Sequence, residues 1–512
     1  MPLRYCAALL VALAWLVAYP ARADSVIVKD IIQGPPSGGP TQLVNIDGVL
    51  YFQARDLNGA EELWRSDGTR AGTKLVKDIY PGSMGSRPEG FVVHQGSIYF
   101  IARDEDGDEL WTTDGTAAGT VQITDINPGS GDSLMRFTKA DDFWRPAMVS
   151  VGKWLYFAAD DGESGFELWR SDGTEAGTKR VKDIFRGPDG GIEAPRFAVV
   201  GDTLFFFAKN NLNQGIELWK SDGTAQGTVL VQSINDVPGD TAFPSPLDTD
   251  GILAATSTNV FFRGFDGSDF GLYTSDGASV TRLVETSPSG VVSPNFLDGL
   301  TVWRDLLYFR ANTDGRGAEL WVSDGTPAGT RILREYASEN GSTVRNPTEF
   351  VPSGDYLFFA CDTGNRVRLG QELCRTDGTP EGTVLVKEIQ PGTGFSSPSE
   401  FVDVEGILYF TARTDDLGVE LYRSDGTPQG TYLAEDLVEG STPGNPVQLT
   451  ALDRRLVYTY NDRERGTEMH RYCCDSAKSQ SIAVIEDTTG NGAPDIATFR
   501  VDDADRMEIR VY

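Results

Sequence analysis

One repeated segment constrains the fold of this chain more than any other feature. Its first clear copy is Glu62-Leu63-Trp64-Arg65-Ser66-Asp67-Gly68-Thr69, followed by Gly72-Thr73. A repeat of roughly 40–50 residues is typical of propeller blades, whose units bury their apolar faces only by stacking. The position of Trp64 recurs at intervals of 47 to 58 residues, at Trp111, Trp169, Trp219, Tyr273, Trp321, Cys374, Tyr422 and His470.

Each unit predicts four short strands. The first is a weak apolar run, the second an aromatic run such as Leu50-Tyr51-Phe52, the third the Glu-Leu-Trp segment and the fourth a run such as Leu75–Ile79. β-branched and aromatic residues dominate, and turn residues interrupt them at short intervals. The spacing of apolar residues predicts no helix after the N-terminal region. We therefore expect an all-β fold, a β-propeller of eight or nine four-stranded blades.

The N-terminal segment Ser25–Ile31 matches the fourth strand of the repeat, although no complete unit precedes it. Closing a ring removes the exposed edges that invite aggregation. We predict that this strand completes the last blade, whose own strands lie between about Pro446 and Cys473. Nine blades result if every unit folds. The unit around Gly264 to Glu285 lacks Thr-x-x-Gly-Thr, so eight blades are the alternative.

The recurring residues have structural and functional interpretations. Ser-Asp-Gly-Thr fits a turn in which Asp accepts backbone N–H groups and Gly takes a positive φ, and it also fits a ligand site repeated around a ring. The Trp fits a core position, where about 150–250 Å² of buried indole stabilises by roughly 4–6 kcal/mol at most, and it also fits a stacking platform for sugars. We favour the structural interpretation for both.

The pattern resembles the ELWxxDGT repeat family of secreted bacterial proteins, over nearly all of the mature chain. The resemblance implies a β-propeller and brings no assigned reaction. Residues 1–23 read as a signal peptide, with a short apolar region and the cleavage pattern Ala21-Arg22-Ala23. No later stretch is apolar enough to insert in a membrane. We expect a propeller domain over residues 24–474 that is secreted or held at the cell surface.

The C-terminal segment, residues 475–512, is expected to be a separate β segment that docks on the ring or begins a domain cut short. Its residues 485–496 are similar to the calcium loop of integrin-type FG-GAP repeats, on Asp487, Asn491 and Asp495. Oxygen ligands at alternate positions suit calcium, which is the one cofactor the sequence suggests. A plain hairpin turn at Asn491-Gly492 is the alternative.

Four cysteines follow the signal region, and an exported protein permits disulfides. Cys361 lies in the second strand of its unit and Cys374 takes the Trp position of the third. Because these strands are adjacent and antiparallel, we predict a Cys361–Cys374 disulfide. Cys473 and Cys474 are neighbours, and both a vicinal bridge and an intermolecular link remain open.

Acidic loops between the second and third strands and polar loops between units are expected to share one face, where variable loops on a rigid scaffold bind ligands. The longest insertion, residues 130–147, carries Phe143, Trp144 and Arg145, our candidate ligand-binding residues. The alternative is a solvated or packed loop without a ligand.

A formal net charge of −30 disfavours nucleic acid and anionic membranes as partners. The sequence contains no nucleophile elbow, zinc-protease motif or phosphate-binding loop, so no catalytic residue is predicted. We consider an interaction or adhesion scaffold for an extracellular protein or glycan, a calcium-dependent adhesion module, and last an enzyme acting on polysaccharide through two carboxylates. Neither the ligand nor the oligomeric state follows from the sequence.

Overall fold

The computed structural model describes residues 25–34, 37–129, 131–136, 148–193, 195–209, 216–234, 253–266, 270–285, 297–312, 318–334, 345–362, 370–391, 394–473, 482–485, 495–501 and 507–511. The predicted signal peptide lies outside them. One compact unit spans Ser25–Tyr472, and a second contains the C-terminal segment. In the described part of the chain, no helix has the length and apolarity needed to cross a membrane.

Within the described residues, the first unit consists of nine four-stranded antiparallel sheets. Blades one to five contain β2 (Thr41–Ile46), β3 (Val49–Arg55), β4 (Glu61–Ser66) and β5 (Lys74–Lys77); β6 (Glu89–His94), β7 (Ser97–Asp104), β8 (Gly107–Thr113) and β9 (Val121–Thr124); β10 (Met148–Val151), β11 (Trp154–Ala159), β12 (Glu167–Ser171) and β13 (Lys179–Lys182); β14 (Phe197–Val200), β15 (Thr203–Lys209), β16 (Ile216–Ser221) and β17 (Val229–Leu230); and β18 (Leu253–Ala255), β19 (Val260–Phe265), β20 (Phe270–Ser275) and β21 (Val280–Glu285).

Blades six to nine follow the same order, except that the last takes its fourth strand from the N-terminal end of the chain. They contain β22 (Leu297–Trp303), β23 (Leu306–Ala311), β24 (Glu319–Ser323) and β25 (Arg331–Ile332); β26 (Arg345–Ser353), β27 (Tyr356–Asp362), β28 (Gln371–Thr376) and β29 (Val384–Lys387); β30 (Ser399–Val404), β31 (Ile407–Thr414), β32 (Gly418–Ser424) and β33 (Tyr432–Glu435); and β34 (Val447–Leu452), β35 (Arg455–Asn461), β36 (Thr467–Cys473) and β1 (Val26–Lys29). The C-terminal segment forms a three-stranded sheet of β37 (Ile482–Ile485), β38 (Asp495–Val501) and β39 (Met507–Val511).

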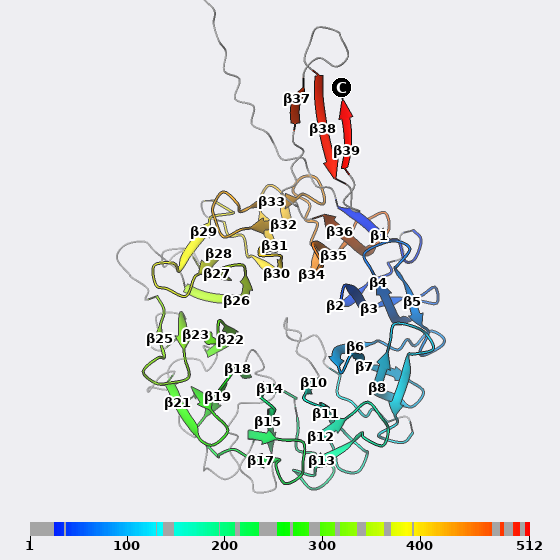
Figure 1. Cartoon of the computed structure of the whole chain (residues 1–512), viewed down its shortest axis with the longest axis vertical. Coiled ribbons are helices and arrows are strands. Elements are labelled where there is room, and N and C mark those ends of the chain that lie inside the picture. The colour runs from blue at the N-terminus through cyan, green and yellow to red at the C-terminus, as the bar shows by residue number, and fades with distance from the viewer. Residues whose placement is uncertain are drawn as a thin grey trace, which may run out of the picture. The chain divides into compact units, whose positions relative to one another are not determined.

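The first strands of neighbouring blades contact one another in an unbroken circuit, from β2 through β6 and onward to β34, which contacts β2 again. Figure 1 shows these blades following one another around a ring. The predicted all-β propeller is confirmed, with nine blades. The eight-blade alternative is wrong, because the fifth unit keeps a working turn without Thr-x-x-Gly-Thr: the N–H groups of Ala278 and Ser279 donate to Asp276 at 2.8 and 3.1 Å.

The predicted closure by the N-terminal strand is also confirmed. β1 pairs antiparallel with β36, with Val26 opposite Arg471 and Ile27 opposite His470 (Figure 1). The buried Glu468 carboxylate then accepts the N–H groups of Ile31 at 3.2 Å and Gly38 at 2.7 Å. The two ends of the ring are thus joined by a strand ladder and by a buried side chain.

Each blade buries both of its faces, since side chains alternate along a strand. In blade one, Phe52 and Trp64 pack with β1 and blade nine, whereas Tyr51 and Leu63 pack with blade two around Phe100. The same sharing of a core by two neighbours recurs around the ring. No blade can therefore complete its core without the blades on both sides.

The Trp positions belong to this core. Trp64 is 8% exposed, and at the variant position Cys374 is fully buried. The Lys29 ammonium lies 5.6 Å from the centre of the Trp64 ring and donates to the Thr73 carbonyl at 2.6 Å, so it links blade nine to blade one. The same pairing joins Lys77 to Trp111 and Thr120, and Lys182 to Trp219 and Thr228. A buried indole covered by a lysine is not a platform for sugars.

The Ser-Asp-Gly-Thr element is a turn whose polar groups satisfy one another. The N–H and hydroxyl of Thr116 donate to Asp114 at 2.8 and 2.7 Å, and these bonds lower the pKa of Asp114. The hydroxyls of Thr113 and Thr120 lie 2.7 Å apart. Gly115, at φ 82°, takes the left-handed conformation that other residues resist. The structural interpretation of the motif holds.

Cys361 and Cys374 form a disulfide between β27 and β28, with Cα atoms 5.8 Å apart. Cys374 lies opposite Phe359 in the ladder, and Cys361 lies two residues after Phe359 on the same face. The prediction is confirmed. Cys473 ends β36, and Cys474 lies outside the described residues.

Removing β1 should open the ring. We expect a chain that begins at Gly34 to lose the burial of Val28 and Ile31, about 1.5–3 kcal/mol each, and to self-associate through the exposed edge of β36. Thermal unfolding and light scattering against the full-length chain measure both effects. Val26→Ala, at a half-exposed position of the same strand, is the control. An unchanged melting temperature and a monomeric state would contradict the closure.

The disulfide closes a short loop, since its cysteines are 13 residues apart. We expect the double change Cys361→Ser and Cys374→Ser to cost about 3 kcal/mol of stability. A reducing agent should lower the melting temperature of the wild-type chain towards that of the variant and leave the variant unchanged. Mass spectrometry that finds two free thiols in protein secreted into an oxidising medium would reject the bridge.

Candidate functional site

The two sets of loops expected to share a face do so. The loop between blades one and two is held on both sides: Arg87 donates its N–H to the carbonyl of Glu61, where the third strand begins, and Arg103 donates to the carbonyl of Ser86, both at 2.9 Å. The same arrangement brings Asn445, between blades eight and nine, to 3.1 Å from the carbonyl of Val419. We call this surface the loop face.

In blades one to four and seven to nine, the glutamate at the start of the third-strand motif holds the loop face together, a role that the sequence did not reveal. The Glu62 carboxylate is fully buried and accepts the N–H of Ile79 at 2.8 Å and both the N–H and hydroxyl of Ser86, at 3.0 and 2.6 Å. It therefore fixes the loop that leads to blade two. Equivalent bonds are made by Glu109, Glu167, Glu217, Glu372, Glu420 and Glu468.

Burial raises the pKa of six of these carboxyls, because it penalises the charged form more than the donated hydrogen bonds favour it; the six are Glu62, Glu109, Glu167, Glu372, Glu420 and Glu468. The pKa of Glu109 rises to about 8, and that of Glu167, Glu420 and Glu468 to about 7. Raised pKa values are common at catalytic sites. Here the carboxyls repeat around the ring and accept the N–H groups of the loops between blades, which is a structural role.

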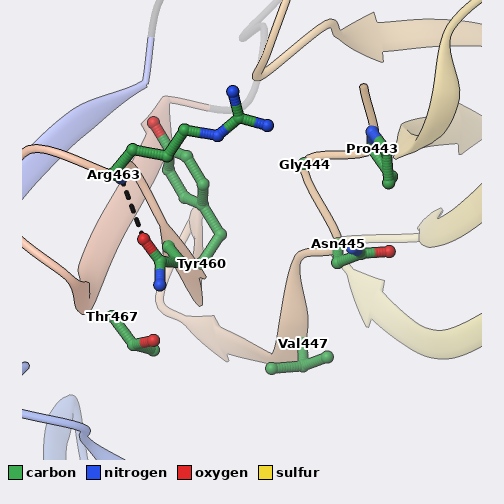
Figure 2. Close-up of a pocket in the computed structure, with 8 residues that line it drawn as sticks. Pro443, Gly444, Asn445, Val447, Tyr460, Arg463 and Thr467 are labelled. Atoms are coloured by element: carbon green, nitrogen blue, oxygen red, sulfur yellow. Dashed lines mark hydrogen bonds between the residues drawn. The ribbon is translucent and has the colours of Figure 1, made fainter. Parts of the chain in front are cut away.

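A pocket of about 300 Å³ opens on the loop face at the junction of blades eight and nine (Figure 2). It lies between the loop before β34 and the loop that joins β35 to β36, and its volume is at the lower end for ligand sites. Figure 2 shows Arg463 and Tyr460 on one side of it, with Asn445 and Pro443 on the other. The lining residues are Pro443, Gly444, Asn445, Val447, Tyr460, Asn461, Arg463 and Thr467.

Tyr460 supplies the aromatic surface of this pocket. Its half-buried ring packs on His470, with ring centres 4.2 Å apart, and its hydroxyl has no hydrogen-bond partner among the described residues. Burial raises the pKa of Tyr460 to about 12 and lowers that of His470 to about 4. Tyr460 is thus a protonated donor at neutral pH, supported by an uncharged imidazole. The histidine stands at the Trp position of its unit.

Arg463 supplies the charge. It is exposed, and its backbone is held at φ 66° by an N–H bond of 2.9 Å to the side-chain oxygen of Asn461. Its guanidinium makes no ion pair or hydrogen bond with any residue the structure describes. The neighbouring Asp462 is instead paired with Arg465 at 2.9 Å. The pocket therefore combines one aromatic ring, one guanidinium without a partner among the described residues, and several amide and hydroxyl groups.

Of the ligand residues predicted from the sequence, the structure describes Asp495 alone. Phe143, Trp144 and Arg145 lie outside the described residues, as do Asp487 and Asn491. Asp495 is the first residue of β38, opposite Ile485. Among the described residues, no group of three or more His, Cys, Asp or Glu side chains is arranged to hold a metal ion.

Within the 130–147 insertion, residues 131–136 are described, and they lie on the loop face. The N–H groups of Ser133 and Leu134 donate to the carbonyl of Asp108 at 3.1 and 3.0 Å. Arg136 pairs with Asp108 at 2.6 Å and donates to the carbonyl of Arg87 at 2.7 Å. The insertion therefore begins at a fixed point between blades two and three.

No protein-family model and no curated protein sequence matches the chain. Solved structures of similar fold include prolyl oligopeptidase B from Galerina marginata, with a TM-score of 0.40 and 10% identity over 91% of this chain and 55% of that one. A prolyl endopeptidase has a TM-score of 0.38 and 13% identity over 80% and 54%. The β-propeller domain of the Trilobed protease from Pyrococcus furiosus has a TM-score of 0.31 and 14% identity over 70% and 94%.

The chain spans little more than half the length of the two prolyl peptidases. At these identities the similarity is one of fold. This protein is a nine-bladed β-propeller whose structural neighbours include the propeller domains of peptidases.

The buried glutamates predict how stability depends on pH. A carboxyl whose pKa is higher in the folded chain contributes stability that is complete below the unfolded value of 4.5 and is lost as the pH rises, through about 8 for Glu109. The turn aspartates act in the opposite sense. Their pKa values are lower in the folded chain, so the stability they contribute is complete above the unfolded value of 3.8 and is lost as the pH falls below it. We therefore expect a maximum of stability near pH 4–5 and a fall towards pH 8.

Urea unfolding across this range measures the fall. Glu109→Gln should make this loss of stability between pH 4.5 and pH 8 smaller, by at most about 1.4 kcal/mol for each unit by which folding raises the pKa of Glu109. Glu105→Gln, at an exposed position of the same blade, should leave the loss unchanged. A free energy of unfolding that stays level or rises between pH 4.5 and pH 8 would contradict this assignment.

Proposed function

We propose that this chain is a secreted or cell-surface binding scaffold of the ELWxxDGT type, whose loop face binds an extracellular glycan. The pocket at the junction of blades eight and nine carries the proposal. A half-buried aromatic ring, amide groups and a hydroxyl suit the alternating apolar and polar faces of a sugar ring. The export of the chain and its family are parts of the same proposal and rest on the sequence alone.

The composition of the pocket favours binding over catalysis. Hydrolysis of a glycosidic bond requires two carboxylates on either side of it, and none of the eight lining residues is Asp or Glu. None is His or Cys either, and Tyr460, with its pKa near 12, is too weak an acid to replace them. We therefore rank a binding scaffold above a polysaccharide-degrading enzyme.

A glycan is favoured over a protein as the ligand by the shape of the site. Protein interfaces bury roughly 800 Å² on each partner around a central cluster of anchors. The pocket is small, and the apolar surface it offers comes mainly from Tyr460, Pro443 and Val447. A site of this size fits one or two sugar residues at the end of a chain.

The test is a glycan array with the purified chain and the variant Tyr460→Ala. We expect the wild-type chain to bind a defined set of glycans and the variant to lose at least about tenfold in affinity, because the stacking surface is gone. Tyr80→Ala is the matched control, since Tyr80 is a half-buried tyrosine in another loop of the same face. Turnover is checked by assaying bound glycans for new reducing ends.

Three outcomes would contradict the proposal. They are a wild-type chain that binds no glycan, a Tyr460→Ala variant that binds glycans as tightly as the wild-type chain, and cleavage of the bound glycans. In the last case the polysaccharide-degrading alternative takes precedence.

A further inference from the structure

We infer that the pocket at the junction of blades eight and nine selects a saccharide that bears a single carboxylate, such as a terminal uronic acid, and that Arg463 is the residue that selects it. This inference rests on the proposed glycan-binding function and adds the class of ligand. It is carried by three observations at Arg463: the absence of an ion pair with any described residue, its backbone conformation and the charge of its surroundings.

The first observation is that the acidic neighbours of Arg463 are already paired. The Arg465 guanidinium lies 2.9 Å from the Asp462 carboxylate and 3.7 Å from that of Glu464. The backbone N–H of Arg465 also donates to the Asp462 carboxylate, at 2.6 Å. Arg463 is left with all of its guanidinium donors open among the described residues. A guanidinium binds a carboxylate through two parallel hydrogen bonds, which gives geometric specificity as well as attraction.

The second observation is the strained backbone. In the described parts of the loops that join second and third strands, Arg463 is the one non-glycine residue with a positive φ. The bonds from the Arg463 N–H to Asn461 and from the Asp462 N–H to the carbonyl of Gly466, at 2.9 and 3.3 Å, hold the loop in this form. A long charged side chain at a position that glycine would occupy without strain points to a role for that side chain.

The position of Arg463 relative to Tyr460 supports the same role. Both side chains lie on one side of the pocket, across from Asn445 (Figure 2). A sugar ring against Tyr460 therefore has the guanidinium beside it and an amide opposite. A carboxylate attached directly to that sugar ring is the acidic group placed to meet the guanidinium.

The third observation limits the charge of the ligand. The chain has a formal net charge of −30, so a highly charged polyanion is repelled over distances up to a Debye length, about 8 Å at physiological salt. Other lining residues carry no charge. One carboxylate can be neutralised at Arg463, whereas a chain of sulfates cannot. The site thus fits a sparsely charged acidic saccharide.

The experiment is calorimetric titration of the full chain with three probes: a β-linked glucose disaccharide, the same disaccharide ending in glucuronic acid, and a heparin hexasaccharide. We expect the acidic disaccharide to bind about tenfold more tightly than the neutral one, as suits one charge-assisted bidentate contact. The heparin fragment should bind no more tightly than the neutral disaccharide.

The variants are Arg463→Gln and Arg463→Lys, with Arg454→Gln as the matched control. Arg454 is an exposed arginine of the same blade, in the turn between β34 and β35, paired with Glu405 at 3.0 Å. We expect Arg463→Gln to abolish the preference for the acidic disaccharide while it keeps the affinity for the neutral one. Arg463→Lys should retain part of the preference, because lysine keeps the positive charge but cannot form the two parallel hydrogen bonds of a guanidinium. Arg454→Gln should change neither.

The outcomes separate this inference from the function on which it rests. Equal affinity of the wild-type chain for the two disaccharides, or a preference that survives Arg463→Gln, overturns the selection of a carboxylate and leaves glycan binding in place. Tighter binding of heparin than of either disaccharide overturns it as well. Failure of all three probes, together with an empty glycan array, overturns both.

Discussion

Every blade of this propeller has two apolar faces, and this constraint governs the rest of the structure. Phe52 and Trp64 face one neighbour while Tyr51 and Leu63 face the other, so an unpaired blade would leave one of the two faces in water. The interface between the ninth blade and the first must therefore be formed by strands of the same chain. β1 does this by completing blade nine, and its Lys29 meets Trp64 of blade one in the manner that neighbouring blades repeat.

The loops are fixed by carboxyl groups that the aromatic core cannot replace. Buried glutamates accept the N–H groups of the loops between blades, and exposed aspartates accept those of the turns between the third and fourth strands. The two sets respond to protonation in opposite directions because one is desolvated and the other is not. The described loops between blades are thus hydrogen-bonded to the blades by residues that belong to the repeat itself.

Much of the fold could be predicted because short-range sequence patterns determine it. The period of the Trp position predicted the blades, the early copy of the fourth strand at Ser25–Ile31 predicted the closure, and the alternation of strands placed Cys361 beside Cys374. The glutamate of the repeat was missed because an acidic residue at the start of a strand reads as solvated. The pocket could not be predicted, since it requires Asn445 of one loop and Arg463 of another to meet across two blades, and no local pattern encodes that meeting. His470, which packs on Tyr460, replaces the Trp of its unit, but Tyr273, Cys374 and Tyr422 replace it in theirs, so this change did not mark the pocket.

The closure has a consequence for biosynthesis. The carboxylate that holds Ile31 comes from Glu468, 437 positions later in the chain, so β1 is translated long before the strand with which it pairs. Contacts this distant slow folding. Until residue 468 has been made, the early segment is an unpaired strand, open to proteases and to strands of other molecules. A cell that makes such a chain has reason to shield this segment until residue 468 has been made.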